Sequence, residues 1–458
     1  MYPDMGSDEY RPKRVPAPWR SALNAQGVAW LLVYVCLVLL PLALLLVGPV
    51  PPGREFLREL SVALAFAGTA ILALQFALTA RFRRIKAPYG IDLVYHFHRE
   101  ISYVALTLLV AHPVLLFVLS PRLLALLNPL TAPWRARFAV VALLALIAIV
   151  LTSVLRRRLH IKYEAWRHVH GILAVVAVAL AVAHIEGVGH YVNTPWKRLL
   201  WIAYPSLWGG LLLYLSLVRP WRLTRRPWVV SEVKPERGAA HTMVLEAQGH
   251  SGMSFLPGQF AWLTVGESPF LRHEHPFSFS SSAGGRKRVS FTIKEVGDFT
   301  SRVKEIPPGA KVFLDGAYGY FSIDRHEAPG YVFVAGGIGI TPLMGMLRTM
   351  ADRDDRRPVL LIDVNREWES ITFREELAEL EQRLELTVVH VLTRPAPGWT
   401  GPSGRFRADM LCGLLPDDML ERDYFICGPG PLMDVVERAL HGAGVHFRQV
   451  HSERFDLV

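Results

Sequence analysis

Cysteine is scarce in this chain. Its 458 residues contain three cysteines, Cys36, Cys412 and Cys427. Their spacing provides neither a disulfide framework nor a cluster of thiolate metal ligands. This absence argues against a disulfide-stabilised secreted protein and fits a reducing cytoplasm for any soluble part of the chain.

Charged residues are rare in the first half of the chain. The whole chain is 51% hydrophobic and 20% charged, but residues 28–218 consist almost entirely of long apolar runs, whereas residues 220–458 have the composition of a soluble protein. A helix needs about 20 apolar residues to cross a hydrocarbon core. The sequence predicts six such helices, near 28–49, 59–80, 94–119, 137–155, 165–187 and 199–218.

Several expected signals are also missing. No groove-reading motif accompanies the net charge of +10, so we expect no nucleic-acid partner. The first apolar run has no small-residue cleavage site, and we interpret it as an anchor helix and not as a removable signal. Calcium-binding repeats and proline-rich docking segments are not evident, so the sequence identifies no regulatory protein partner.

Basic residues predict how the chain is oriented. They gather in the N-terminal segment, in the second and fourth connections and after the sixth helix, for example at Arg81, Arg83, Arg84 and Lys86. Cytoplasmic loops are enriched in Lys and Arg. We therefore predict a multi-pass protein of the plasma (inner) membrane with both termini in the cytoplasm.

Four histidines interrupt the apolar runs at a repeated spacing. His98 and His112 lie 14 residues apart in the third run, and His170 and His184 lie 14 apart in the fifth. Fourteen helical residues climb roughly 21 Å and return to within about 40° of the same face. Because both helices run in the same direction, two histidine pairs face each other, one at each depth.

Ionisable groups inside a membrane are costly and indicate function. One such histidine alone is typical of a satisfied polar residue or a proton relay, but four at this spacing are typical of axial haem ligands between facing helices. The sequence predicts two b-type haems, an inner one on His98 and His170 and an outer one on His112 and His184.

Other polar residues flank the inner pair. His96 and His168 lie about 160° round their helices from the distant ligands, so we expect them to be interfacial. Arg99 and Arg167 are either partners of haem propionates or residues that set the orientation of the chain.

The second half of the chain changes from one strand pattern to another. Short apolar segments from near Trp228 predict a small antiparallel β-barrel, which contains HPFSFSS (275–281) and VGDFT (296–300). From Gly330 onward, strand–loop–helix repeats predict an α/β parallel-sheet domain. Its YVFVAGGIGITPLMGMLR segment passes from strand to helix through glycines, which let backbone N–H groups approach a pyrophosphate. The third glycine of the dinucleotide fingerprint is absent.

These motifs together resemble a known family. HPFS, VGDFT, GGIGITP and CGPGPLM (427–433), in this order, are similar to the ferredoxin–NADP reductase-type dehydrogenase domain. Joined to six helices with paired histidines, the chain resembles the NADPH oxidase and ferric reductase superfamily, as a bacterial transmembrane flavocytochrome b. The resemblance implies a multi-domain membrane protein, with residues 1–27 as a cytoplasmic segment, 28–219 as a six-helix bis-haem bundle, 226–327 as an FAD-binding β-barrel and 328–458 as an NAD(P)H-binding α/β domain.

The resemblance also implies roles for individual residues. The flavin would be lined by His275, Pro276, Phe277 and Ser278, with the Ser278 hydroxyl near its reactive nitrogen, and the FAD pyrophosphate would be held by Gly297, Asp298, Phe299 and Thr300. The pyridine nucleotide would be held by Gly336, Gly337, Gly339, Thr341 and Pro342. The nicotinamide would lie beside Cys427, Gly428 and Pro429. Phe455 stacks on the flavin and must move to admit nicotinamide, although three residues follow it, unlike the animal oxidases that end on this aromatic. Cys427, Ser278 and Phe455 are the implied catalytic residues. Alternatively, Phe277 and Phe299 are core aromatics and Cys427 is a small buried residue.

A polar cluster predicts the choice of nucleotide. Thr393 and Arg394 follow the apolar segment LTVVHVL, and Arg405 follows a short loop later. A hydroxyl and guanidinium groups bind the 2′-phosphate of NADPH, so we predict NADPH over NADH. The alternative is that these are solvated surface arginines.

The predicted activity is transmembrane electron transfer from NADPH through FAD and two haems to an extracytoplasmic acceptor. Oxygen and a ferric chelate remain alternatives for that acceptor. Animal oxidases place a polar histidine one turn beyond the outer ligand, where this chain has Leu116, and Arg58 either polarises oxygen or anchors its helix at the interface. A more remote alternative is a non-enzymatic transporter or channel with a nucleotide-sensing domain.

Overall fold

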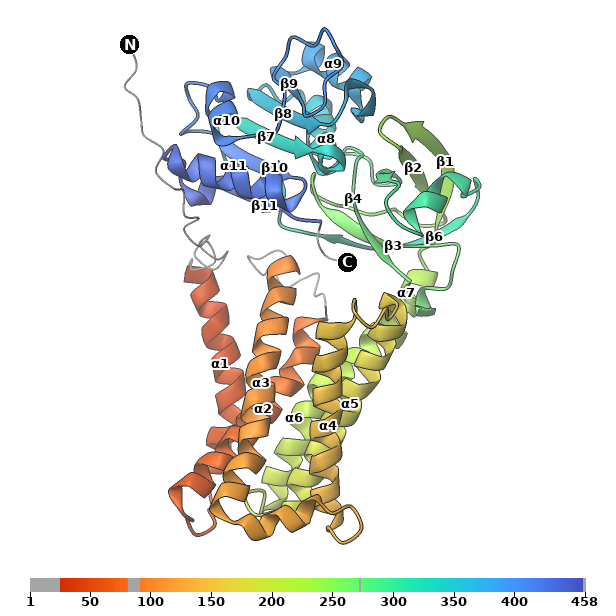
Figure 1. Cartoon of the computed structure of the whole chain (residues 1–458). Coiled ribbons are helices and arrows are strands. Elements are labelled where there is room, and N and C mark those ends of the chain that lie inside the picture. Colours follow the sequence, from red (N-terminus) through yellow and green to blue (C-terminus); the bar gives the residue numbers. More distant parts are fainter. Residues whose placement is uncertain (1–24, 81–90, 272, 456–458) are drawn as a thin grey trace, which may run out of the picture.

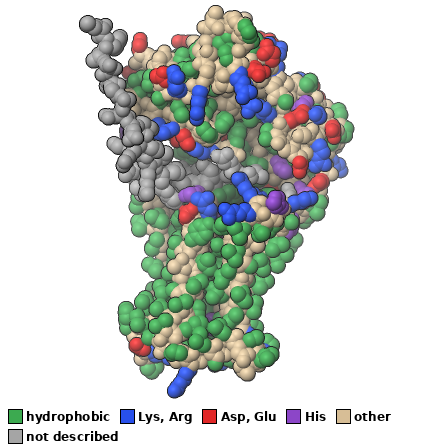
Figure 2. All heavy atoms as spheres, viewed as in Figure 1, with side chains coloured by type: hydrophobic (Ala, Val, Ile, Leu, Met, Phe, Trp, Pro, Cys, Tyr) green, Lys and Arg blue, Asp and Glu red, His purple; other side chains and the backbone are tan. Residues whose placement is uncertain are grey.

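The computed structural model describes residues 25–80, 91–271 and 273–455, in which a bundle of helices carries two β-sheets at one end (Figure 1). The N-terminal basic segment and the basic connection at residues 81–86 lie outside the described residues. Figure 2 shows hydrophobic side chains over the surface of the bundle, with Lys and Arg gathered where the bundle meets the sheets.

The predicted membrane spans are confirmed: among the described residues, six helices are long and apolar enough to cross a membrane. Helices α1, α3 and α5 run away from the sheets, and α2, α4 and α6 run toward them (Figure 1). A π-helical turn and the short helix α7 continue α6 into an apolar span that ends at Thr224. The bounds are α1 Ala25–Leu45, α2 Phe56–Leu78, α3 Ile91–Leu119, α4 Trp134–Leu155, α5 Tyr163–Val188, α6 Pro195–Leu213 and α7 Arg219–Thr224.

The first sheet is antiparallel and has the strand order β4-β3-β6-β1-β2-β5. Its edge strands β4 and β5 come together where Phe279 pairs with Phe291, which closes the sheet toward a barrel. A core of apolar side chains fills the inside and includes Phe279, Phe291 and Trp228, all fully or almost fully buried. The strands are β1 Trp228–Glu236, β2 Ala240–Ala247, β3 Phe260–Val265, β4 His275–Ser278, β5 Arg288–Lys294 and β6 Lys311–Tyr318.

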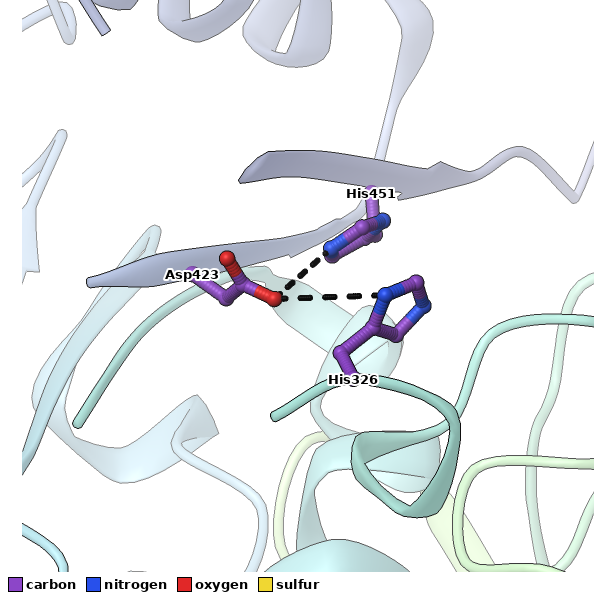
Figure 3. A group of neighbouring side chains, drawn as sticks. All are labelled: His326, Asp423 and His451. Carbon is purple, nitrogen blue, oxygen red and sulfur yellow. Dashed lines mark hydrogen bonds and ion pairs between the residues drawn. The ribbon is translucent and has the colours of Figure 1, made fainter. Parts of the chain in front are cut away.

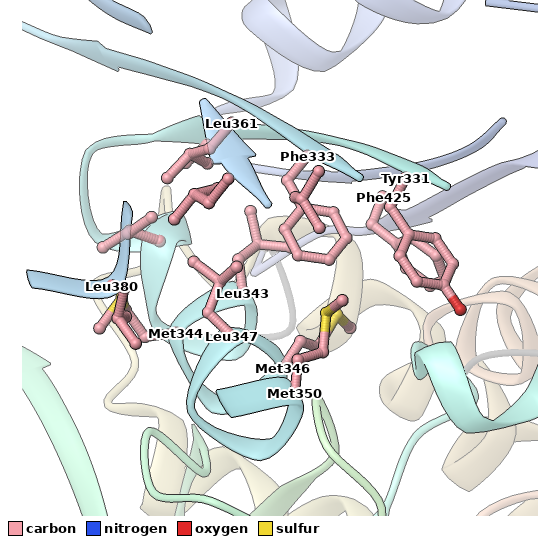
Figure 4. Close-up of a cluster of buried hydrophobic side chains, with 14 of the residues drawn as sticks. Tyr331, Phe333, Leu343, Met344, Met346, Leu347, Met350, Leu361, Leu380 and Phe425 are labelled. Atoms are coloured by element: carbon pink, nitrogen blue, oxygen red, sulfur yellow. The ribbon is translucent and has the colours of Figure 1, made fainter. Parts of the chain in front are cut away.

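The second sheet is parallel, with the order β11-β10-β7-β8-β9. Side chains alternate across a strand, so Tyr331 and Phe333 of β7 pack against α8 and α9 (Figure 4), while Val332 and Val334 face α10 and α11. The predicted fold class is confirmed by these layers. The elements are β7 Tyr331–Gly336, α8 Ile340–Asp352, β8 Val359–Asn365, α9 Arg374–Arg383, β9 Leu386–Leu392, α10 Ala408–Leu414, β10 Asp423–Cys427, α11 Gly430–Gly442 and β11 Val450–Glu453.

Two ion pairs join the bundle to the antiparallel sheet. Arg219 of α7 pairs with Asp315 of β6, and the Arg219 guanidinium also lies over the Tyr318 ring. On α5, Arg167 pairs with Glu274, which directly precedes β4. These contacts hold strand β4, which carries the HPFS motif, against the end of helix α5, which carries His170.

Candidate electron-transfer site

The inner histidines of α3 and α5 face each other. The ring centres of His98 and His170 lie 6.4 Å apart, with 53° between the ring planes. The Nδ1 atom of His170 lies 3.4 Å from the Ser153 hydroxyl of α4. The Nδ1 atom of His98 is buried and has no hydrogen-bond partner among the described residues.

The outer histidines are each held by a backbone carbonyl of a neighbouring helix. His112 Nδ1 lies 3.0 Å from the Ser61 carbonyl oxygen of α2, and His184 Nδ1 lies 2.8 Å from the Arg135 carbonyl oxygen of α4. A carbonyl only accepts, so Nδ1 carries the proton in both rings, and Nε2 retains its lone pair. This is the arrangement in which a second group fixes the tautomer of a metal-ligating histidine.

The separation of the inner rings is compatible with two ligands of one haem iron. A bond from a metal to an imidazole nitrogen is about 2 Å long, so two rings that share one iron have centres roughly 6 Å apart. The inner pair has this separation, and its orphaned buried nitrogen is a group that a cofactor or its surroundings must satisfy. The outer pair shows the matching tautomers. Haem ligation by all four histidines remains a prediction.

The neighbouring polar residues lie apart from these pairs. His168 is exposed, and the Nδ1 atom of His96 lies 2.9 Å from the Arg99 guanidinium at an exposed position. Arg99 also pairs with Glu100. Arg167 is less exposed and pairs with Glu274 at 2.7 Å. Besides binding a haem propionate or setting the orientation of the chain, Arg167 can therefore join the bundle to the antiparallel sheet.

The HPFS motif (275–278) and the VGDFT loop (296–300) come together although 17 residues separate them. His275 of β4 stacks on Phe299, with ring centres 4.1 Å apart, and Phe277 lies 6.0 Å from the same ring. Ser278 is buried, and Pro276 pairs with Trp262 of β3. Phe277 and Phe299 also pack against the barrel core, so both the flavin role and the core role remain open.

The Thr300 hydroxyl organises the loop that is predicted to hold the pyrophosphate. It accepts hydrogen bonds from the backbone N–H groups of Val296 and Gly297, at 2.9 and 2.8 Å. Gly297 has open space where a Cβ would lie, and Asp298 is exposed. The loop is therefore shaped internally and leaves one face open for a ligand.

Two glycine-containing loops pack closely at the carboxyl edge of the parallel sheet. A Cβ on Gly339 would lie 2.2 Å from the Cys427 carbonyl oxygen, and one on Gly336 would lie 2.6 Å from a Leu432 methyl carbon. Because β7 and β10 are neighbours, the GGIGITP and CGPG segments form one cradle. Thr341 and Pro342 are buried in the first turns of α8, where the Thr341 hydroxyl donates to the Ile338 carbonyl.

The Cys427 side chain lies inside the sheet core. It is completely buried together with Phe333 and Phe425. Burial, and then the nearby Glu453, raise the pKa of the Cys427 thiol well above its ordinary value, so the thiol is protonated at neutral pH. This burial favours the interpretation of Cys427 as a small residue of the core. A direct contact between Cys427 and the nicotinamide remains a prediction. Gly428 and Pro429 lie at the adjoining loop.

The predicted 2′-phosphate site lies at the same edge. Arg394 follows β9, and its backbone N–H donates to the Arg366 carbonyl just beyond β8. Gly404 donates to Leu392, which places Arg405 beside the end of β9. Arg366, Arg394 and Arg405 are all exposed. Arg366 is a candidate that sequence reasoning missed, because one arginine after a strand forms no motif.

Another missed candidate is Lys294, the last residue of β5. Its Nζ atom lies 4.0 Å from the position of a Cβ on Gly337, while the VGDFT loop begins two residues later. The ammonium thus lies between the two loops that are predicted to hold phosphates. Ser61, which fixes His112, was missed as well. In both cases the signal is a contact between distant segments, so the sequence alone does not reveal it.

The end of the chain lies beside the antiparallel barrel. A Cβ on Gly319, just after β6, would lie 3.5 Å from the Glu453 carboxylate at the end of β11. Arg454 pairs with Asp434 of α11, and Phe455 is 43% exposed. Phe455 is thus held near the barrel and is free enough to move, but its stacking on flavin remains a prediction.

Comparison with known proteins identifies both halves of the chain. Residues 64–181 match the family described as the ferric reductase like transmembrane component, and residues 333–438 match the oxidoreductase NAD-binding domain. The chain is 31% identical over 225 residues to the stachydrine N-demethylase reductase subunit of Rhizobium meliloti, a match that covers 47% of this chain and 63% of that protein. It is 30% identical over 209 residues to the glycine betaine monooxygenase reductase subunit of Pseudomonas aeruginosa, covering 44% and 56%.

The matches thus span less than two thirds of these relatives. Among solved structures, the FAD/NAD-binding domain of nitric oxide dioxygenase from Vibrio cholerae is 22% identical, with a TM-score of 0.44, covering 50% of this chain and 98% of that one.

The chain thus combines a part similar to the ferric reductase like transmembrane component with a part similar to oxidoreductase NAD-binding domains. A ferric reductase-like transmembrane part followed by a ferredoxin-reductase-like dehydrogenase part is consistent with the ferric reductase and NADPH oxidase-like superfamily. The resemblance that the sequence motifs indicate is thereby confirmed.

Proposed function

We propose that this chain transfers electrons from cytosolic NADPH through FAD and two b-type haems to an acceptor on the opposite side of the membrane, with oxygen as the favoured acceptor. The observation that carries the proposal is the inner histidine pair, His98 and His170, with ring centres 6.4 Å apart. This pair lies at the end of the bundle where Arg167 contacts Glu274, beside the flavin motif.

The residues of the dehydrogenase part bring donor and flavin together. Bound FAD would supply the conversion between hydride transfer from NADPH and single-electron transfer to haem. The cradle at Gly336 and Gly339 binds the nucleotide diphosphate through backbone N–H groups. The β4 motif, with His275 stacked on Phe299, holds the flavin against the end of α5.

Within the bundle, the four histidines divide by depth. His98 and His170 hold the inner haem, and His112 and His184 hold the outer one. Ser61 and the Arg135 carbonyl keep the outer rings in the tautomer that leaves Nε2 available. Apolar side chains of the surrounding helices exclude water from the path.

The charge pattern supports a cytoplasmic position for the dehydrogenase part. Arg156, Arg157 and Arg158 follow α4 at the end of the bundle that carries the sheets. Enrichment of Lys and Arg on the cytoplasmic side supports NADPH oxidation inside the cell and acceptor reduction outside, with the chain in the plasma (inner) membrane.

A second candidate acceptor is a ferric chelate, which the match to a ferric reductase-like component favours. At the outer end, Arg54 pairs with Glu59 and donates to the Tyr191 hydroxyl at 2.9 Å, and Arg58 is exposed nearby. This polar network suits a charged chelate as well as a developing superoxide anion.

The test is anaerobic reduction of the purified protein by NADPH, followed by addition of oxygen or of a ferric chelate while haem reoxidation is timed. Faster reoxidation by oxygen, with superoxide as product, supports the oxidase function, and faster reoxidation by the chelate supports the reductase function. A protein without a dithionite-sensitive b-type Soret band would instead favour the non-enzymatic transporter.

A further inference from the structure

We propose that His326, Asp423 and His451 form a binding site for a divalent transition-metal ion, with zinc as the ion of choice. The site lies outside the electron path. Asp423 is the first residue of β10, His451 is the second of β11, and His326 lies in the segment between the two sheets. The nucleotide cradle lies at the carboxyl ends of β7 and β10, so this cluster occupies the opposite edge of the sheet.

The three side chains converge on one carboxylate oxygen (Figure 3). Asp423 Oδ2 lies 3.2 Å from His451 Nε2 and 4.0 Å from His326 Nδ1. The three candidate ligand atoms all lie within 4.8 Å of one another. The imidazole rings are stacked, with centres 3.7 Å apart and 30° between their planes.

The chemistry of this set suits zinc and its neighbours in the first transition series. Two imidazoles and a carboxylate form a common ligand set for such ions, with ligand bonds of about 2.0–2.2 Å and an open fourth position. Ligands of a tetrahedral ion therefore lie roughly 3.4 Å apart. The 4.0 Å between Asp423 and His326 exceeds this separation, so binding requires the partly exposed His326 ring to shift toward the carboxylate.

The burial of the cluster is a second, independent observation. Asp423 is 8% exposed, and a buried carboxylate requires a cation or hydrogen bonds. His326 faces Asp423 with Nδ1, while the Nε2 atom of the same ring is buried without a hydrogen-bond partner among the described residues.

An ion at this position would connect three segments that are far apart in the sequence. It would tie the segment between the sheets to β10 and to β11, and β11 leads directly to Phe455. Bound zinc would therefore raise the midpoint of thermal unfolding and hold the C-terminal strand in place.

The experiment uses the full chain in detergent, loaded with haem and FAD, with its affinity tag removed and metals stripped by a chelator. Zinc chloride is titrated calorimetrically. We expect one zinc per chain, and a loss of affinity of roughly a hundredfold or more in Asp423→Asn and His451→Ala, because even outer partners of a ligand change affinity about 10–100-fold. His441→Ala, at an exposed position on α11, is the matched control and should bind as the wild type does.

The proposal is overturned if the wild type binds no zinc, or if Asp423→Asn binds it with unchanged affinity. Haem and FAD content report whether each variant is folded. If a variant does not fold, X-ray absorption at the zinc edge of the wild type decides: two imidazole ligands support the site, and any other number overturns it.

Discussion

At the scale of single residues, the histidine spacing makes predictions that differ from ring to ring. Replacing His98 or His170 by Ala should remove the inner haem, and replacing His112 or His184 should remove the outer one. Each change leaves the other pair of ligands intact, so haem content should fall from two per chain toward one. Pyridine haemochrome stoichiometry measures the loss.

The controls for this experiment are the neighbouring histidines. His96→Ala and His168→Ala should retain both haems, because His168 is exposed and His96 contacts Arg99 instead of a facing histidine. NADPH should still reduce FAD in the inner-haem variants, while electron flow to the outside acceptor stops. Loss of a haem in His96→Ala, with both kept in His98→Ala, would show that the helical register is wrong.

Arg394 makes a second prediction at this scale. A hydrogen bond to a charged group is worth about 1.5–3 kcal/mol, so Arg394→Ala should raise the KM for NADPH roughly tenfold or more and change the KM for NADH little. Steady-state kinetics with both nucleotides measure this. Arg407→Ala is the matched control, since Arg407 is equally exposed but pairs with Asp409. An equal rise in both KM values would contradict a 2′-phosphate site.

At the scale of secondary-structure elements, the contact between α5 and the segment before β4 determines how the flavin meets the bundle. Arg167 and Glu274 are both mostly buried, and removing one member of such a pair leaves the other charge without its partner. Arg167→Glu should slow haem reduction by NADPH several-fold, while flavin reduction keeps its rate. Stopped-flow spectra resolve the two steps.

The charge-exchanged double variant, Arg167→Glu with Glu274→Arg, should recover most of the haem-reduction rate. Arg353→Ala is the control, because its pairing with Asp324 lies within the dehydrogenase part. If the double variant is as slow as the single one while haem content is unchanged, the pair does not dock the two parts.

The C-terminal strand β11 carries another prediction. Truncation after Arg454 removes Phe455 and should change the rate of flavin reduction while haem content stays the same, because β11 ends beside Gly319 of the barrel and contributes no haem-ligand histidine. Truncation after Phe455 is the matched control and should behave as the full chain. An unchanged flavin-reduction rate in the shorter protein would count against a gate at Phe455.

At the scale of the whole molecule, the sequence predicts most of the architecture. Apolar runs long enough for a membrane can form little else, so the positions of the six spans follow from composition. The histidine pairs are visible because a helix converts a fixed spacing into a shared face. The two sheets follow from their strand patterns and from the glycine loop before α8.

The parts that the sequence does not predict depend on contacts between distant segments. Arg167 and Glu274 are 107 residues apart, and Ser61 and His112 are 51 apart. His326, Asp423 and His451 lie in three separate segments, and only the order of strands β11-β10-β7 brings them together. Burial also alters a residue's chemistry, as it does for Cys427, and burial is a property of the packed chain.

The direction of α3 has an electrical consequence. The inner histidines lie at the end beside the sheets and the outer ones 14 residues further along, so electron transfer along this path moves negative charge across most of the bilayer while the proton from NADPH stays behind. Turnover along the proposed path would then be electrogenic, and an inside-negative membrane potential would assist each outgoing electron by about 2.3 kcal/mol for every 100 mV. In a sealed cell the protein would act as a current source that slows as the membrane depolarises, unless a separate cation pathway carries compensating charge outward.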